Sequence, residues 1–176
     1  MSQAHADNGP LTRPGQAALL VPMPADPASI LMAVHQRIER QFAAYQQAEG
    51  SHPRQYRAVG AIAAALATHV ALEQELLYPA VRAHTGRHDA EIDRQLEQNH
   101  LLDLILVELG GMVPTDPRYD AKVRLLRHTF GQHAGDAEAL LIPELRRRLD
   151  PGEREQLGRQ LLGRIGQLEG RPRPGW

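Results

Sequence analysis

Two stretches of the chain repeat one pattern of a histidine, a carboxylate and a proline. The first is His69-Val-Ala-Leu-Glu-Gln-Glu-Leu-Leu-Tyr-Pro79, and the second is His133-Ala-Gly-Asp-Ala-Glu-Ala-Leu-Leu-Ile-Pro143. In each, an acid follows the histidine after four or five residues, and proline stands at the tenth position. Because four residues are about one helical turn, His69 and Glu73 project from one helix face about 6 Å apart. Such a pair offers a nitrogen and an oxygen ligand to the same metal ion.

The remaining composition limits which metal chemistry is available. The chain has no cysteine, which excludes disulfides, thiolate catalysis and thiolate metal sites. Nine histidines in 176 residues is well above ordinary usage. Any metal must therefore be held by imidazole and carboxylate, a donor set that suits iron, manganese, copper or zinc.

Apolar residues recur at helical spacing through most of the chain, with breaks at glycine and proline. Asp26-Pro27 and Asp150-Pro151 have the N-cap and the early proline that begin a helix. No segment shows sustained two-residue alternation, so we expect no strands. The periodicity predicts long helices at about 27–49, 54–83, 89–109 and 119–149, and a shorter helix at about 151–168.

Long helices joined by short breaks are typical of an up-down-up-down four-helix bundle. The chain is therefore predicted to be all-α, with a flexible N-terminal arm over 1–24, the bundle over 25–149, and a short extra C-terminal helix and tail over 150–176. Pro79 and Pro143 fall inside helical patterns. Each is expected to remove a backbone hydrogen bond and bend its helix.

Each long helix is expected to direct one imidazole into the bundle. His35 lies on an apolar stripe of the first helix, and His100 follows Leu96 by one turn on the third. A lone histidine on an apolar face is usually a core residue with one hydrogen-bond partner. Four of them on four helices, two with a spaced acid, favour a metal site instead, because bound cations offset the cost of buried carboxylates.

The third helix is apolar nearly all round between Leu101 and Leu109. A helix of this kind needs cover on more than one side. The C-terminal helix or a partner in a homodimer could supply the second cover.

Charge and hydropathy argue against other kinds of partner. Twenty basic and twenty-one acidic residues nearly cancel, so we expect no binding to nucleic acid or to an anionic membrane surface. We find neither a run of membrane-spanning length nor the basic-then-apolar order of a secretion signal. The sequence predicts a cytoplasmic protein.

The chain resembles the hemerythrin-like (HHE cation-binding) family over roughly residues 27–149. The resemblance rests on His35 within Ile-Leu-Met-Ala-Val-His-Gln-Arg-Ile, on the two His-to-Pro segments, and on His100. It implies a four-helix bundle that holds two non-haem irons, bridged by two carboxylates and an oxygen species. Carried over by residue, it implies the ligands His35, His69, His100 and His133, with Glu73 and Glu138 as bridges.

Two departures from the family pattern affect this ligand set. The second acid is at the fifth position, Glu138, because the fourth is Ala137; respiratory members have Asp at that spacing, and the longer Glu can serve.

Those members also supply two histidines one turn apart from the third helix, whereas Leu104 follows His100 here. The ligand set implied for this chain therefore has one nitrogen fewer than that of the respiratory members. Either a coordination position is left open, or an oxygen compensates; the candidates are Glu97, Asp103, Glu39 and Tyr45. Asp103 is equally well explained as an exposed acid on the less buried side of the helix.

These features leave several functions open. One is a protein whose di-iron centre binds a small oxidant (dioxygen, nitric oxide or peroxide) for sensing, detoxification or iron handling. Another is a di-iron enzyme that activates oxygen or decomposes peroxide. A third is a metal-free helical interaction module. Zinc is disfavoured because it usually takes four ligands and six converge here, and haem because the donors exceed its axial requirement.

Overall fold

The computed structural model describes residues 26–85 and 89–170, and within them it contains helices and no strand. The prediction of an all-α chain is confirmed. The elements in chain order are α1 (Pro27–Gln47), α2 (His52–Leu72), the π-helical segment η1 (Glu73–Leu77), α3 (Tyr78–Thr85), α4 (Asp89–Gly110), α5 (Tyr119–Asp136), the π-helical segment η2 (Ala137–Leu141), α6 (Ile142–Arg148) and α7 (Pro151–Glu169). The predicted arm over 1–24 lies outside the described residues.

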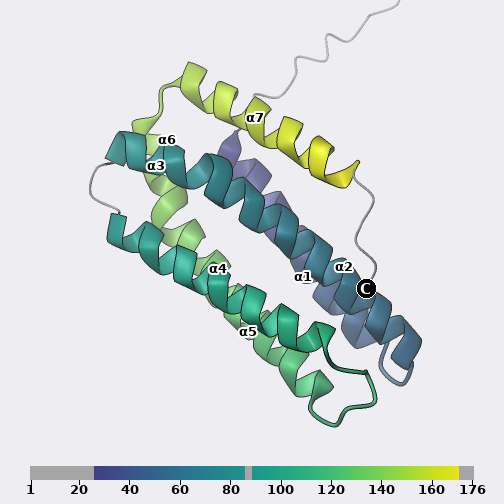
Figure 1. The fold of residues 1–176 in the computed structure, drawn as a ribbon. Helices are drawn as coiled ribbons and strands as arrows, with labels where there is room; N and C mark the ends of the chain where they lie inside the picture. Colours follow the sequence, from purple (N-terminus) through teal and green to yellow (C-terminus); the bar gives the residue numbers. More distant parts are fainter. Residues whose placement is uncertain (1–25, 86–88, 171–176) are drawn as a thin grey trace, which may run out of the picture.

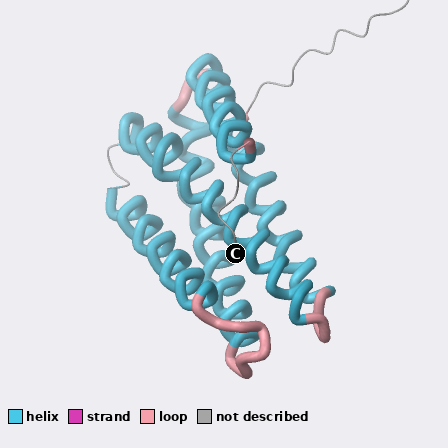
Figure 2. The backbone as a smooth tube through the Cα atoms, turned by 45° about the vertical axis from the view of Figure 1, so that its right-hand side comes forward, coloured by secondary structure: helices cyan, strands magenta, loops and turns pink. Residues whose placement is uncertain are grey.

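The helices lie side by side in two pairs. α1 packs along α2, and α4 packs along α5 (Figure 1). α2, η1 and α3 continue as one rod, and α5, η2 and α6 as another, so that α3 also packs against α6. α7 lies across α1 and α2. The described loops are short and join the rods at their ends (Figure 2).

Two helix starts follow from local hydrogen bonds that the sequence predicted. The Asp26 carboxylate accepts from the backbone N–H of Ser29 at 3.2 Å, with Pro27 as the first helical residue of α1. At α7, the Asp150 carboxylate accepts from the backbone N–H of Glu153, and the Glu153 carboxylate accepts from that of Asp150, both at 2.9 Å. This reciprocal pair is a capping box.

The two interior prolines are accommodated by π-helical turns. η1 ends two residues before Pro79, and η2 ends two residues before Pro143. The backbone N–H of Tyr78 donates to the carbonyl of Glu73, and that of Ile142 to the carbonyl of Ala137, each five residues back. Such π-helical turns occur frequently at functional sites. η1 and η2 each begin four residues after the histidine of their copy of the repeated pattern.

Helix α4 buries only one of its apolar faces. Residues at three- and four-residue spacing along it are buried: Ile92, Gln95, Asn99, Leu102, Leu106 and Leu109. Leu101, Leu104 and Val107 are exposed by 46%, 48% and 73%. Of the two covers that the sequence left open for this helix, the C-terminal helix does not supply it, because α7 packs on α1 and α2. Cover by a second copy stays a prediction.

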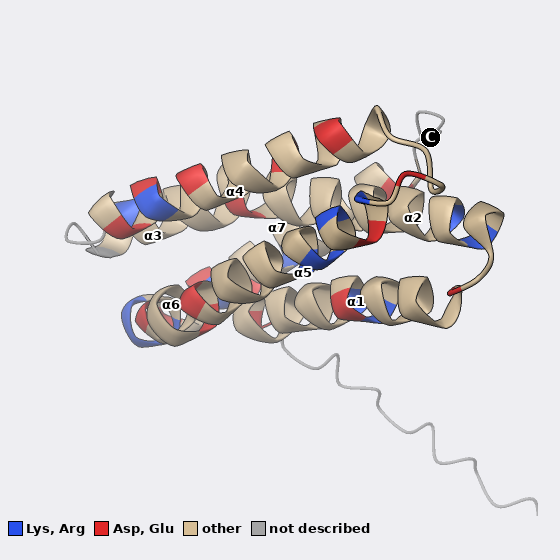
Figure 3. Cartoon of the chain, turned by 90° about the horizontal axis from the view of Figure 1, so that it is seen from below, with Lys and Arg blue, Asp and Glu red and all other residues tan. Residues whose placement is uncertain are grey.

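Charged residues follow the outer faces of the rods. Acidic and basic side chains are interspersed along the helices (Figure 3). Among the described helices, none combines the length and the apolar character that crossing a membrane requires.

The register of α4 can be tested by removing a side chain from each face. Leu102 is fully buried and Leu104 is half exposed on the same helix. Leu102→Ala should lower the free energy of unfolding by ~2–5 kcal/mol, because it leaves a cavity in the core. Leu104→Ala should change it by less than about 0.5 kcal/mol. Urea denaturation measures both variants, and a larger loss for Leu104→Ala than for Leu102→Ala would contradict this register.

Candidate metal centre

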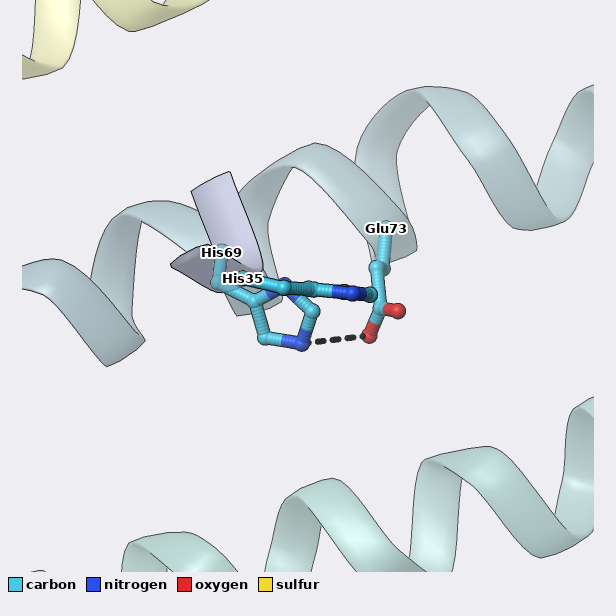
Figure 4. Close-up of side chains that lie close together, drawn as sticks. All are labelled: His35, His69 and Glu73. Carbon is cyan, nitrogen blue, oxygen red and sulfur yellow. Dashed lines mark ion pairs between the residues drawn. The ribbon is translucent and has the colours of Figure 1, made fainter. Parts of the chain in front are cut away.

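Four ligand-type side chains meet in the interior, and we refer to them as the buried quartet: His35 of α1, His69 of α2, Glu73 at the start of η1 and His133 of α5. His35 is 4% exposed, and the other three are fully buried. Donor atoms of His35, His69 and Glu73 all lie within 4.8 Å of one another (Figure 4). These three and His133 are sequence-predicted site residues that the structure brings together.

Three donor atoms of the buried quartet form a small triangle. His69 Nε2 lies 2.9 Å from His133 Nε2, and Glu73 Oε2 lies 3.0 Å from His133 Nε2 and 3.3 Å from His69 Nε2. Two ligands at right angles around a transition metal, with bonds of about 2.1 Å, lie about 3.0 Å apart. The spacing therefore fits donors that share one cation.

The surroundings set the protonation states of His69 and Glu73. Removal from water lowers the pKa of His69 to about 3, because the charged imidazolium is disfavoured in the interior. Burial alone would raise the pKa of Glu73, but the neighbouring His69 and hydrogen bonds from His133 and Asn99 outweigh it and lower that pKa to about 2. A neutral imidazole beside an ionised carboxylate is the form in which both groups bind a metal.

One oxygen of Glu73 is held by the protein, and the other is left free. The hydroxyl of Tyr78 donates to Glu73 Oε2 at 2.7 Å, and Asn99 Nδ2 donates to the same oxygen at 3.0 Å. Glu73 Oε1 is buried and has no hydrogen-bond partner among the described residues. A buried carboxylate oxygen without a partner is costly. This orphaned atom is consistent with a cation ligand.

His35 is oriented by Glu138 from the rim of the site. Glu138 Oε1 lies 2.6 Å from His35 Nδ1, although the Glu138 side chain is 40% exposed. His35 Nε2 is buried and finds no partner in the described part of the chain. A carboxylate on one ring nitrogen fixes the tautomer and leaves the other nitrogen free for a metal. Glu138 thus lies next to the cluster, and its bridging role stays a prediction.

His100 does not join the cluster. The prediction that it faces the interior is wrong, because the buried stripe of α4 passes through Asn99 and leaves His100 exposed. One residue is about 100° of helix rotation. The third long helix therefore contributes a carboxamide to the site where the sequence predicted an imidazole.

The oxygen donors considered as replacements lie elsewhere. Glu97 and Asp103 are exposed on α4. Glu39 pairs with the guanidinium of Arg127 at 2.9 Å. Tyr45 is buried but lines a separate cavity of about 290 Å³, together with Phe42 and Asp120.

Sequence reasoning missed Tyr78 and Asn99, which donate to Glu73, and Gln95, which is buried one helical turn from Asn99 on α4. The signal for the last two was the spacing of Ile92, Gln95, Asn99 and Leu102, which places two amides on an apolar stripe. Amides on such a stripe are buried polar groups that need partners. Tyr78 stands directly before Pro79 in the repeated pattern, where its hydroxyl reaches back to Glu73.

Comparisons with known proteins agree with this geometry. The family model described as "Hemerythrin HHE cation binding domain" matches residues 26–156. A solved structure of a hemerythrin HHE cation-binding domain-containing protein from Mycobacterium kansasii is similar, with a TM-score of 0.72 and 20% identity over 82% of this chain and 88% of that one. This likeness shows the fold.

A curated relative is also similar over part of its length. It is a DNA nickase from Nostoc sp., 28% identical over 124 residues, which are 69% of this chain. The match covers 34% of the relative, so the chain spans about a third of its length.

The protonation states make the stability of the metal-free protein depend on pH. The unfolded chain binds a proton at His69 near pH 6.5, whereas the folded chain resists until about pH 3. Stability should therefore fall as pH is lowered from about 6.5, with a slope of up to ~1.4 kcal/mol per pH unit for this one proton. Glu73 adds a further loss below about pH 4.5, the region in which its unfolded carboxylate becomes protonated.

Urea denaturation between pH 7 and pH 5 measures this slope. His69→Gln should reduce it, and His100→Gln, at an exposed position on α4, is the matched control. Equal slopes in the two variants would contradict the assignment of His69 as a buried neutral imidazole.

Proposed function

The chain belongs to the hemerythrin HHE cation-binding family, and from this premise we propose that it is a non-haem iron protein that binds small oxidants: dioxygen, nitric oxide or peroxide. The observation that carries the proposal is the buried quartet, in which donor atoms of His35, His69 and Glu73 lie close together and His133 contacts both His69 and Glu73. Imidazole and carboxylate together are ligands that suit iron. Bound iron would supply a coordination position for a small ligand and electrons to reduce it.

The residues of this chain would hold and shield that iron. His35, His69, His133 and Glu73 would ligate it, with Tyr78 and Asn99 keeping the Glu73 carboxylate in place. Phe130 is fully buried, and its ring stands edge-on to His35 and His69, at centroid distances of 5.9 and 5.7 Å. This apolar ring would keep bulk water away from the imidazoles.

We propose two irons at full occupancy, within an up-down-up-down bundle, as the family resemblance implies. The ligand set is then His35, His69, Glu73, His133 and Glu138, without His100. Glu138 would have to turn from His35 Nδ1 to act as the second bridge. The exposed Leu101, Leu104 and Val107 of α4 are the surface through which we propose a homodimer.

An enzyme that activates oxygen or decomposes peroxide is the second candidate. The observation that favours it is the hydroxyl of Tyr78, 2.7 Å from the Glu73 carboxylate, because a phenol there could give a proton to a bound oxidant. A metal-free helical module is less well supported, since it leaves Glu73 Oε1 and His35 Nε2 buried without partners among the described residues.

Iron content tests the ligand assignment. Glu73→Ala should reduce bound iron to less than about half of the wild-type value, because it removes the buried anionic ligand of the site. His100→Ala is the matched control and should retain wild-type iron, since His100 is exposed. Metal analysis with an optical spectrum of the aerobic protein measures both variants. Full iron occupancy and an unchanged spectrum in Glu73→Ala would refute the assignment.

Addition of oxidant to the reduced protein separates the two candidate functions. A stable adduct with dioxygen or nitric oxide that is reversed by removing the gas is expected for a binding protein. Repeated consumption of peroxide by substoichiometric protein would instead establish turnover. Tyr78→Phe removes the phenolic O–H and should slow such turnover about 10-fold or more when the rate is expressed per bound iron, since the loss of the hydrogen bond to Glu73 also weakens iron binding.

A further inference from the structure

Two carboxamides on one face of α4, which we call the carboxamide wall, adjoin the metal centre through Asn99, which donates to Glu73. Gln95 and Asn99 are both fully buried, and they lie one helical turn apart on the same face of α4. Neither amide atom of Gln95 has a hydrogen-bond partner among the described residues, and Asn99 Oδ1 also has none there. Three buried polar atoms of these two amides are therefore without a partner in the described part of the chain.

The chemistry of Glu73 fixes the orientation of Asn99. An ionised carboxylate only accepts hydrogen bonds, so the Asn99 atom 3.0 Å from it must be the donating nitrogen. The carbonyl oxygen of Asn99 has no partner among the described residues and is left as a neutral acceptor. Asn99 thereby holds Glu73 against α4, and the atom that Asn99 leaves free is a neutral carbonyl oxygen.

Neutral carboxamides are weaker ligands for divalent transition metals than imidazoles and carboxylates. The other side of the centre has three imidazoles and the Glu73 carboxylate in close contact. Glu138, the second acid of the proposed ligand set, lies 2.6 Å from His35 Nδ1 and would have to turn away from it to act as a bridge. The donors thus divide into a strong side and a weak side.

The net charge of the site also favours binding of one cation over binding of two. Glu73 is the one carboxylate of the buried quartet, and Glu138 stands at its rim. Two divalent cations carry four positive charges against these two negative ones. In an interior of low dielectric the second cation is repelled by the first, and neutral amides do not compensate for this.

We infer that the centre fills in two unequal steps: the buried quartet takes one divalent cation tightly, and the carboxamide wall of Gln95 and Asn99 holds a second one weakly and exchangeably. The inference rests on the proposed function and specifies its stoichiometry.

Anaerobic titration of the metal-free full chain with ferrous iron tests the inference, with calorimetry and metal analysis after dialysis against a chelator as readouts. We expect the second dissociation constant to be weaker than the first by on the order of 100-fold. One ion should survive dialysis. Two ions of equal affinity would overturn the inference and leave the proposed function intact, whereas absence of iron binding would overturn the proposed function itself.

Gln95→His provides a gain-of-affinity test, because it places an imidazole on the weak side without disturbing the Asn99–Glu73 hydrogen bond. The second dissociation constant should decrease by about 10-fold or more, and the first should not change.

Gln98→His is the matched control three residues along α4, where the native side chain donates to Asp136 of α5. An equal effect of both variants on the second step would contradict the role of the carboxamide wall. A wild-type melting temperature shows that each variant folds, and the wild-type titration decides the inference if one does not.

Discussion

The site depends on a carboxylate that has no access to water. Glu73 is fully buried, and its charge is stabilised by the Tyr78 hydroxyl, the Asn99 amide and the imidazoles of His69 and His133. These partners come from α2, α3, α4 and α5, so the helices must dock in one register for the charge to be tolerated. Even so, Glu73 Oε1 and His35 Nε2 are left without partners in the described residues. We propose that a cation on the free donors completes this arrangement.

The two copies of the repeated pattern are equivalent in backbone and different in chemistry. Each has a histidine, a π-helical turn four residues later and a proline after it. The buried position at the start of the turn is Glu73 in the first copy and Ala137 in the second. The acid of the second copy is one residue further, at Glu138, which turns it toward the rim and lets it reach His35. One copy thus supplies the interior anion and the other orients an imidazole.

Much of this could be predicted from the sequence, for identifiable reasons. The helix starts at Asp26 and Asp150 follow from capping, and the convergence of His69, Glu73, His35 and His133 follows from four-residue spacing and apolar stripes. His100 was misplaced because α4 is apolar on several faces, so hydrophobicity alone does not select which face is buried. The choice is made by packing against α5 and by the hydrogen bond of Asn99 to Glu73, which are interactions between distant segments. At Pro79 and Pro143 the sequence predicts only a bend and not a π-helical turn, since a proline marks a lost hydrogen bond but not how the helix adapts.

The most direct test of the central claim is anomalous diffraction at the iron absorption edge from crystals of the iron-loaded protein. The account predicts a strong peak beside His69 Nε2, His133 Nε2 and Glu73, with any second and weaker peak toward Gln95 and Asn99. A structure in which the imidazoles are packed against one another with no iron peak between them, or in which iron lies at His100, would contradict it.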